Sequence, residues 1–315
     1  MSAARVAFLL LFACAAAQAQ NYPTRPIRIE TGSVGSNGDV ASRLIGAVMG
    51  PSLGQTIIVE NLPSGIVLGE TVAKAAPDGH TLLVTGSSFW LAPFLEQKVP
   101  WDPVRDFAPV SLVSTSPNLI VVHPSVPVKN VKELIALARS RPGELNYASG
   151  STGSTPHLAA ELFNVMAKVN IVRVNYKGVG PAVVDLVAGR VQVMYPNAGS
   201  VAEHLRSGRL RGLAVTTAKP TALFPGLPTA ASEGLAGYEA EVLNGMFAPA
   251  KTPPAIVTRI SQEVARALSR ADIKDKLFNT GMEPIGGGPE QLSVAMKREI
   301  TDWGKLIRDQ GIRNQ

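Results

Sequence analysis

Cysteine is almost absent from this sequence. The single one among 315 residues is Cys14, inside an apolar run from Val6 to Ala17 that follows Arg5. Ala17-Gln18-Ala19 then offers a small-x-small cleavage site. These three features are typical of a secretory signal peptide, so we expect residues 1–19 to be removed on export. The remaining chain would have no disulfide, no thiolate metal site and no cysteine nucleophile.

An alternative stays open at Cys14. The segment Leu11-Phe-Ala-Cys14 loosely resembles a lipoprotein processing box, which would leave a lipidated Cys14 at the new N-terminus. The well-placed Ala-x-Ala site favours soluble export over lipidation.

Long hydrophobic runs are also lacking. The run in the leader is too short to span a bilayer, and nothing later approaches that length. Aromatic residues make up only 5% of the chain, the formal net charge is a mild +6, and no basic run interleaves with aromatics. This composition argues against nucleic-acid binding. A weakly basic exported protein fits small anionic ligands, although an ordinary solvated surface would give the same charge.

Signatures of catalysis, cofactors and metals are missing. There is no Gly-x-Ser-x-Gly nucleophile elbow, no Walker loop and no Gly-x-Gly-x-x-Gly fingerprint. The four histidines, His80, His123, His157 and His204, do not pair at ligand spacing. Acidic residues are scattered, and no carboxylate pair suggests an acid/base couple. We therefore predict no catalytic residue, no metal site and no cofactor, and we disfavour an enzyme.

Short β-branched runs alternate with helical patterns along the chain, which predicts α/β domains with mostly parallel sheets. The length after export suggests two of them. The predicted strands are Ile27–Glu30, Thr56–Glu60, Thr81–Thr85, Leu119–Val122, Leu145–Ala148, Ile171–Asn175, Val191–Tyr195 and Leu213–Thr216. The predicted helices are Asp39–Met49, Val131–Ser140, His157–Met166, Pro181–Ala188, Val201–Arg206, Pro254–Ser269 and Glu290–Arg308.

Loops of small residues follow four of the predicted strands, at 31–38, 86–88, 149–155 and 176–180. In α/β sheets, ligands bind beyond the carboxyl ends of strands, where such loops lie. The third loop leads into a helix with Ser154 or Thr155 as the N-cap and Pro156 in the first turn. Free backbone N–H groups, hydroxyls and the positive end of a helix dipole then meet, which suits a carboxylate or a phosphate.

The chain also resembles a known family in a series of short motifs that run in order from about residue 21 to 311. They include Tyr22-Pro-x-x-Pro-Ile-Arg28, Val59-Glu-Asn61, Ala76-Pro-Asp-Gly-His-Thr-Leu-Leu83, Asp106-Phe-Ala-Pro-Val110, Tyr147-Ala-Ser-Gly150, Tyr176-Lys-Gly178, Leu213-Ala-Val-Thr216 and Leu227-Pro-Thr229. These motifs are similar to those of the Bug/TctC family, the periplasmic substrate-binding proteins of tripartite tricarboxylate transporters.

The resemblance implies a two-domain Venus-flytrap fold with the ligand closed between the domains. Its pattern places the crossings between domains near Val122–Pro124 and Phe247–Pro249. Domain 1 would then comprise residues 21–122 and 249–315, and domain 2 residues 123–248.

The resemblance further implies a small carboxylate ligand: a di- or tricarboxylate, an acidic amino acid or an aromatic acid. We expect a periplasmic monomer that delivers this ligand to membrane permease subunits. An alternative is a ligand sensor that signals to a membrane receptor, and a periplasmic enzyme is a third, less favoured reading.

The family pattern also implies site residues. Gly35, Ser36 and Asp39 match its first ligand loop, while Ser149, Thr152, Gly153 and Ser154 match the loop of domain 2, and Tyr176 belongs to its Tyr-Lys-Gly. We add Ser87, Ser88 and Asn197 because they follow strands at the cleft. For Asp39 we weigh contact with a ligand amine, holding of waters, and helix capping. Thr31-Gly32 in place of Pro-Phe, and Arg173 in place of a histidine, depart from the family.

Overall fold

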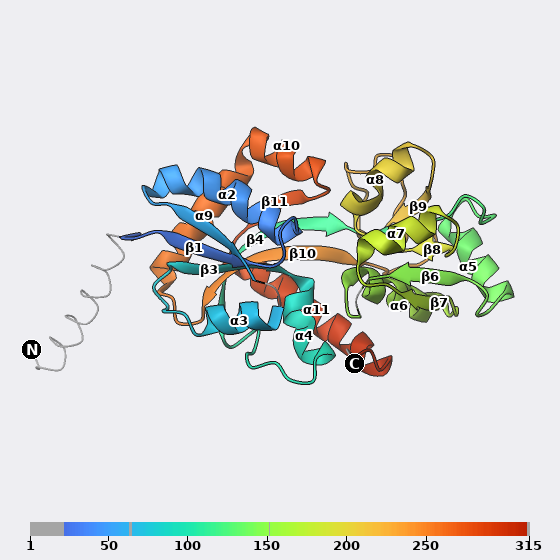
Figure 1. Cartoon of the computed structure of the whole chain (residues 1–315), viewed down its shortest axis with the longest axis horizontal. Coiled ribbons are helices and arrows are strands. Elements are labelled where there is room, and N and C mark those ends of the chain that lie inside the picture. Colours follow the sequence, from blue (N-terminus) through green and yellow to red (C-terminus); the bar gives the residue numbers. More distant parts are fainter. Residues whose placement is uncertain (1–21, 63–64, 151, 314–315) are drawn as a thin grey trace, which may run out of the picture.

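The computed structural model describes residues 22–62, 65–150 and 152–313, and it shows two α/β lobes joined by extended strands (Figure 1). Each lobe has one sheet. The first has the strand order β11-β4-β10-β3-β1-β2, and the second β7-β6-β8-β5-β9. The predicted fold class, two α/β units, is confirmed. The predicted leader lies outside the described residues.

The strands of the first sheet are β1 (Ile27–Thr31), β2 (Ile57–Asn61), β3 (Thr81–Gly86), β4 (Phe107–Pro117), β10 (Glu241–Pro249) and β11 (Glu283–Gly287). Those of the second are β5 (Leu119–Val122), β6 (Asn146–Ser149), β7 (Val172–Asn175), β8 (Val193–Met194) and β9 (Arg211–Val215).

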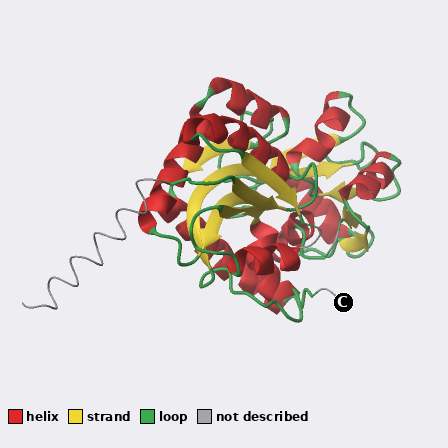
Figure 2. Cartoon of the chain, turned by 60° about the vertical axis from the view of Figure 1, so that its left-hand side comes forward, coloured by secondary structure: helices red, strands yellow, loops and turns green. Residues whose placement is uncertain are grey.

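Helices flank both sheets (Figure 2). Around the first sheet lie α2 (Asn37–Leu53), α3 (Gly65–Ala73), α4 (Ser87–Leu95), α9 (Pro254–Ser269), α10 (Ala271–Asn279) and α11 (Pro289–Asp309). Around the second lie α5 (Val131–Ser140), α6 (Thr155–Ala167), α7 (Val179–Val187) and α8 (Ala198–Arg206). Among the helices that the structure describes, none combines the length and hydropathy needed to cross a membrane.

Both sheets are mixed, which refines the predicted mostly parallel arrangement. β1 pairs in parallel with β2 and β3, and β6 with β7 and β8. β10 pairs antiparallel with β3 and β4, and β5 pairs antiparallel with β8 and β9. β11 also pairs antiparallel with β4. Of these opposing strands, β5 and β10 begin just after the chain has passed from one sheet to the other, so they enter from the partner lobe.

The chain passes from the first sheet to the second between β4 and β5, and it returns to the first sheet at β10. β4 ends at Pro117 in the first sheet and β5 starts at Leu119 in the second, while β10 already belongs to the first sheet from Glu241. The division into domains at 122 and 248 stays a prediction, since sheet membership alone does not define units that move independently.

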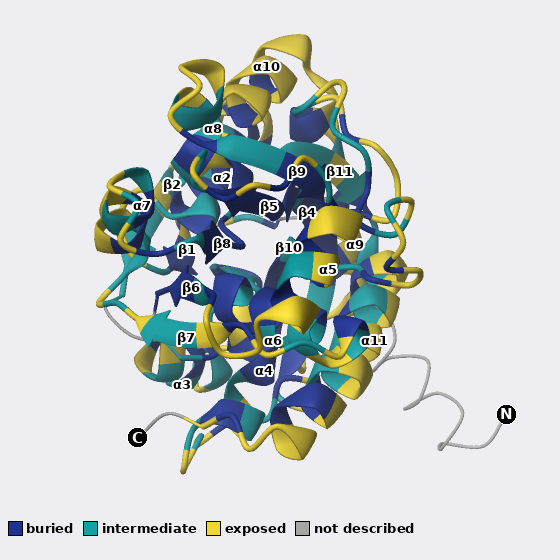
Figure 3. Cartoon of the chain, turned by 90° about the vertical axis from the view of Figure 1, so that its right-hand side faces the viewer, coloured by how far each residue is buried: buried dark blue, intermediate teal, exposed yellow. Residues whose placement is uncertain are grey.

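The cores are built from the strands and the inner faces of the helices (Figure 3). Trp101, which follows α4 in the chain, contacts both α3 and α4 of the first lobe. Phe89 of α4 stacks on its ring, with ring centroids 4.1 Å apart and an interplanar angle of 8°. Trp101 also donates a hydrogen bond of 3.1 Å to the Ile66 carbonyl. Gly69 allows this approach, because a Cβ there would lie 2.4 Å from the Trp101 ring.

We therefore expect Gly69→Ala to lower the free energy of unfolding by about 1–3 kcal/mol through overpacking. Gly65→Ala, in the same helix, is the matched control because a Cβ there meets no atom within 4 Å. Urea unfolding of both variants checks this. Equal stability of the two variants would contradict the stacking account.

Candidate functional site

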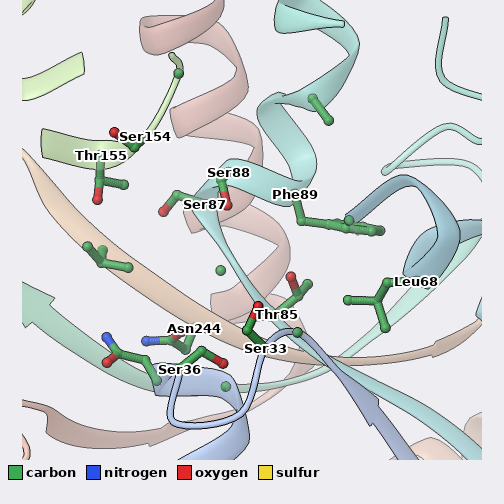
Figure 4. A pocket seen from close by; sticks show the side chains of 18 of the residues that line it. Ser33, Ser36, Leu68, Thr85, Ser87, Ser88, Phe89, Ser154, Thr155 and Asn244 are labelled. Atoms are coloured by element: carbon green, nitrogen blue, oxygen red, sulfur yellow. The ribbon is translucent and has the colours of Figure 1, made fainter. Parts of the chain in front are cut away.

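A pocket of about 680 Å³ lies between the two lobes, within the size range of small-molecule sites. The first lobe contributes the loop after β1, the starts of α2, α3 and α4, and strand β10; the second contributes the starts of α6, α7 and α8. Figure 4 shows Ser36, Ser87, Ser88, Ser154 and Thr155 around one part of the pocket, and Leu68 and Phe89 at another.

The start of α2 is capped by its own sequence. Ser36 is the N-cap, and its hydroxyl accepts a hydrogen bond from the Asp39 N–H. The other helices that begin at the pocket differ. The N-caps of α4, α6, α7 and α8 are Gly86, Ser154, Gly178 and Asn197, and none makes a side-chain capping bond. Four helix N-termini thus present first-turn N–H groups around one space without a capping acceptor.

Two of these N-cap side chains have a buried polar atom that lacks a partner. The Ser154 hydroxyl and the Asn197 carboxamide oxygen make no hydrogen bond within the described structure, and both residues line the pocket. Buried polar atoms are rarely left unpaired, because desolvation without a partner costs about 1–3 kcal/mol. These two atoms are therefore suited to a ligand or to a ligand-bound water.

Cationic side chains are not what would draw an anion to this pocket. Among the described residues that line it there is no lysine or arginine, and Glu96 is the one charged side chain. Each helix N-terminus carries about half a positive charge. Several of them aimed at one space favour an anion, as at known phosphate and carboxylate sites.

Asp39 does not line the pocket, contrary to a direct ligand role. It is buried, and its carboxylate accepts hydrogen bonds from the Gly35 N–H at 2.9 Å, Asn61 Nδ2 at 2.9 Å and Arg43 Nε at 3.0 Å. Burial alone would raise the pKa of Asp39, but these hydrogen bonds outweigh it and hold the pKa below its usual range. Asp39 therefore supports the loop after β1, a role that is not among the three considered from the sequence.

Ser149 also lies behind the pocket, fully buried at the end of β6. Its Oγ accepts a hydrogen bond of 2.8 Å from Arg173, which donates as well to Thr152 Oγ1 at 3.2 Å and to the Gly150 carbonyl at 3.1 Å. Thr152 does line the pocket. Because a guanidinium only donates, the Thr152 hydroxyl hydrogen stays available to a ligand.

His157 holds the same loop from the first turn of α6. Its Nδ1 accepts a hydrogen bond of 3.0 Å from the Gly153 N–H, so this nitrogen carries no proton. Gly153 has a φ of +73°, and a Cβ there would lie 2.4 Å from Leu95 of the other lobe, so a glycine is required. Burial, helped by the nearby Arg173 charge, lowers the pKa of His157 to about 4.

Tyr176 points elsewhere. Its hydroxyl donates a hydrogen bond of 2.9 Å to Asp185 on α7, and the residue is absent from the pocket lining. Of the predicted site residues, Asp39, Ser149 and Tyr176 are therefore not at the pocket surface. The others line it: Gly35, Ser36, Ser87, Ser88, Thr152, Gly153, Ser154 and Asn197. Their contact with a ligand stays a prediction.

Sequence reasoning missed most of the apolar side chains that form one wall of the pocket, and it missed the residues that strand β10 contributes. Leu62, Ile66, Leu68, Ala92 and Leu95 line the pocket beside Phe89, and Val242 and Asn244 reach it from β10. Apart from Leu62, these wall residues sit in α3 and α4, which the periodicity did not reveal. Within the described residues, no group of three or more His, Cys, Asp or Glu side chains could hold a metal ion.

Removing the Asp39 carboxylate should weaken the fold, because Asp39→Ala leaves Arg43, Asn61 and the Gly35 N–H without their acceptor. We expect a loss of about 2–4 kcal/mol in the free energy of unfolding. Asp309→Ala, which removes only an exposed pair with Lys305, should cost less than about 1 kcal/mol. Chemical denaturation measures both; a small effect at Asp39 would show that its bonds are not required.

The His157 pKa predicts a pH dependence of stability. Its folded pKa of about 4 is below the ordinary value of 6.5, so between these values the unfolded chain binds more protons. The free energy of unfolding should therefore fall as the pH drops from 6.5 towards 4. His157→Gln should make this part of the profile flatter. Urea unfolding at several pH values gives both profiles. Parallel profiles for the two proteins would refute the assignment of this pH dependence to His157.

Comparison with known proteins agrees with this geometry. The sequence profile of the tripartite tricarboxylate transporter family receptor, TctC, matches residues 41–312. Protein BugT of Bordetella pertussis is 34% identical over 94% of this chain and 92% of its own length.

Solved structures are similar over nearly the whole chain. Rpa4515 of R. palustris, solved with adipate, is 35% identical with a TM-score of 0.79, covering 93% of this chain and 100% of the other. MatC of Rhodopseudomonas palustris, solved with malate, is 32% identical with a TM-score of 0.75, covering 91% and 100%. The chain therefore belongs to the TctC family of tripartite tricarboxylate transporter receptors, whose members are periplasmic solute-binding proteins.

Proposed function

We propose that this protein captures a small organic carboxylate in the periplasm and delivers it to permease subunits in the membrane. The observation that carries the proposal is the set of uncapped helix N-termini from both lobes around one pocket. The unpaired Ser154 and Asn197 oxygens support it, as do the adipate and malate held by two relatives.

The proposed mode of binding uses neutral donors from both lobes. One carboxylate would accept from the first-turn N–H groups of α4 and α6 and from the hydroxyls of Ser88, Thr152 and Ser154, directly or through water. The wall formed by Leu68, Phe89 and Leu95 would cover the carbon skeleton. Because a ligand held this way contacts both lobes, it would shift an open–closed equilibrium towards closure.

The lobes would then act as two domains that close on the ligand, with the strands β4, β5 and β10 as the connection. We further propose that the protein acts as a monomer after removal of its leader. A sensor that presents the closed form to a receptor would use the same pocket, so ligand-dependent recovery of membrane partners separates the two roles.

The direct test is to purify residues 20–315 without refolding, extract the protein and identify any retained small acid by mass spectrometry. Recovery of an unaltered carboxylate supports capture without turnover. A chemically altered product would favour an enzyme. Failure to bind any acid, both in this extract and in a calorimetric screen of carboxylates, would overturn the proposal.

Loss of one donor should be measurable. Ser154→Ala removes an unpaired hydroxyl from the pocket, so we expect affinity for the captured acid to fall about 5- to 30-fold, or 1–2 kcal/mol. Ser140→Ala changes an exposed serine at the end of α5 and should leave the affinity unchanged. Titration calorimetry measures the affinity of each variant for the acid. Equal affinities for the two variants would place the ligand away from Ser154.

A further inference from the structure

Glu299 is an acidic side chain of α11 directly behind the pocket. Its Oε2 accepts a hydrogen bond of 2.7 Å from Trp90 Nε1, and a side-chain hydrogen bond with Ser87 also reaches it. Ser87 is the first residue of α4, and its Oγ accepts from the Leu243 N–H at 3.1 Å. Since Ser87 lines the pocket, one hydroxyl separates Glu299 from the ligand space.

Two further cavities lie in the same region, behind the ligand pocket. A space of about 10 Å³, roughly one water in size, is lined by Ser87, Thr155, Asn118 and Glu241. Ser87 and Thr155 also line the ligand pocket. The Asn118 side chain is fully buried with neither polar atom paired, which suits a bridging water.

Beyond this space lies a rear cavity of about 330 Å³ between α11 and α6. Glu299 lines it together with Glu239, Glu241, Arg298 and Asp302. Arg298 is engaged by Glu239 at 2.8 Å and by Asp302 at 3.6 Å. Glu241, on β10, accepts a hydrogen bond of 2.5 Å from Thr115.

The charges that face Glu299 are therefore mostly negative, and its own hydrogen-bond donors, Trp90 and Ser87, are neutral. The acidic neighbours on β10 and on the segment before it both oppose ionisation of Glu299. An anion bound on the other side of Ser87 would add a further negative charge. A like charge disfavours the ionised form of a carboxyl, so the ligand and the Glu299 proton would stabilise each other.

We propose that Glu299 is a positioning residue of the ligand site, holding the start of α4 through Trp90 and Ser87, and that its carboxyl takes up a proton when a carboxylate binds. This inference rests on the proposed function. The ionisation of Glu299 supports it: burial, partly offset by Ser87 and Trp90, raises the pKa of Glu299 to about 7. Near neutral pH the carboxyl can thus respond to a new charge.

The test is calorimetry with adipate, or with whichever acid the protein retains, in two buffers of different ionisation enthalpy at pH 7. We expect uptake of up to about half a proton per ligand, because the carboxyl is about half protonated before binding. Affinity should also weaken about 2- to 6-fold from pH 6.5 to 8.5, the effect over that range of a shift of half to one pKa unit.

Glu299→Gln should abolish the proton uptake and flatten the pH dependence, with affinity retained at high pH. Glu290→Gln, on the exposed first turn of the same helix, is the control and should keep both effects. A purely structural role would lower affinity at every pH without changing the proton count.

Binding without proton uptake in the wild-type protein, or uptake that persists in Glu299→Gln, would overturn this inference alone. A protein that binds no carboxylate would overturn the proposed function and the inference with it. If Glu299→Gln fails to fold, the number of protons that the wild-type protein takes up on binding still tests the inference, because binding without uptake would overturn it.

Discussion

The structure depends on the free N–H groups at the helix N-termini that meet between the two sheets. Parallel strands bring the starts of their following helices to one edge of a sheet, and two lobes facing each other bring several such edges together. Gly86, Ser154, Gly178 and Asn197 all leave their helix starts without a side-chain cap. The pocket therefore needs no lysine or arginine to attract an anion.

Apart from Glu96, which lines the pocket, the charged groups described here lie one layer behind this surface, where they hold the loops instead of the ligand. Asp39 fixes the loop after β1 through Gly35, and Arg173 fixes the loop after β6 through Ser149 and Thr152. Neutral His157 accepts from Gly153 in the same loop. Such an arrangement orients neutral donors while avoiding a strong charge beside a bound carboxylate, so small changes behind the pocket can alter binding without touching the ligand.

Much of the secondary structure, and several of the loops that line the pocket, were predictable from local sequence pattern. The spans of α5 and α9 agree with the periodicity, and the loops of small residues after β1, β3 and β6 do line the pocket. Three strands, β4, β10 and β11, and three helices, α3, α4 and α10, were not predicted. β4 and β10 pair with strands far away in the sequence, and α3 and α4 are apolar on most sides, so neither shows a clear periodic signal.

Side-chain direction was the other limit of the sequence. Motif matching placed Asp39, Ser149 and Tyr176 in the right loops, but a motif does not say which way a side chain points. Asp39 and Ser149 turn inward because Asn61 and Arg173, distant in the chain, offer them hydrogen-bond donors. Tyr176 turns to Asp185 on the next helix. These tertiary hydrogen bonds decide which members of a loop face the ligand.

A crystal structure of the protein with its captured acid would test the central claim most directly. The account predicts a carboxylate whose oxygens accept from first-turn N–H groups or serine and threonine hydroxyls of both lobes, directly or through one water, with no lysine or arginine in contact. A carboxylate bound to a cationic side chain, or held by one lobe alone, would contradict it.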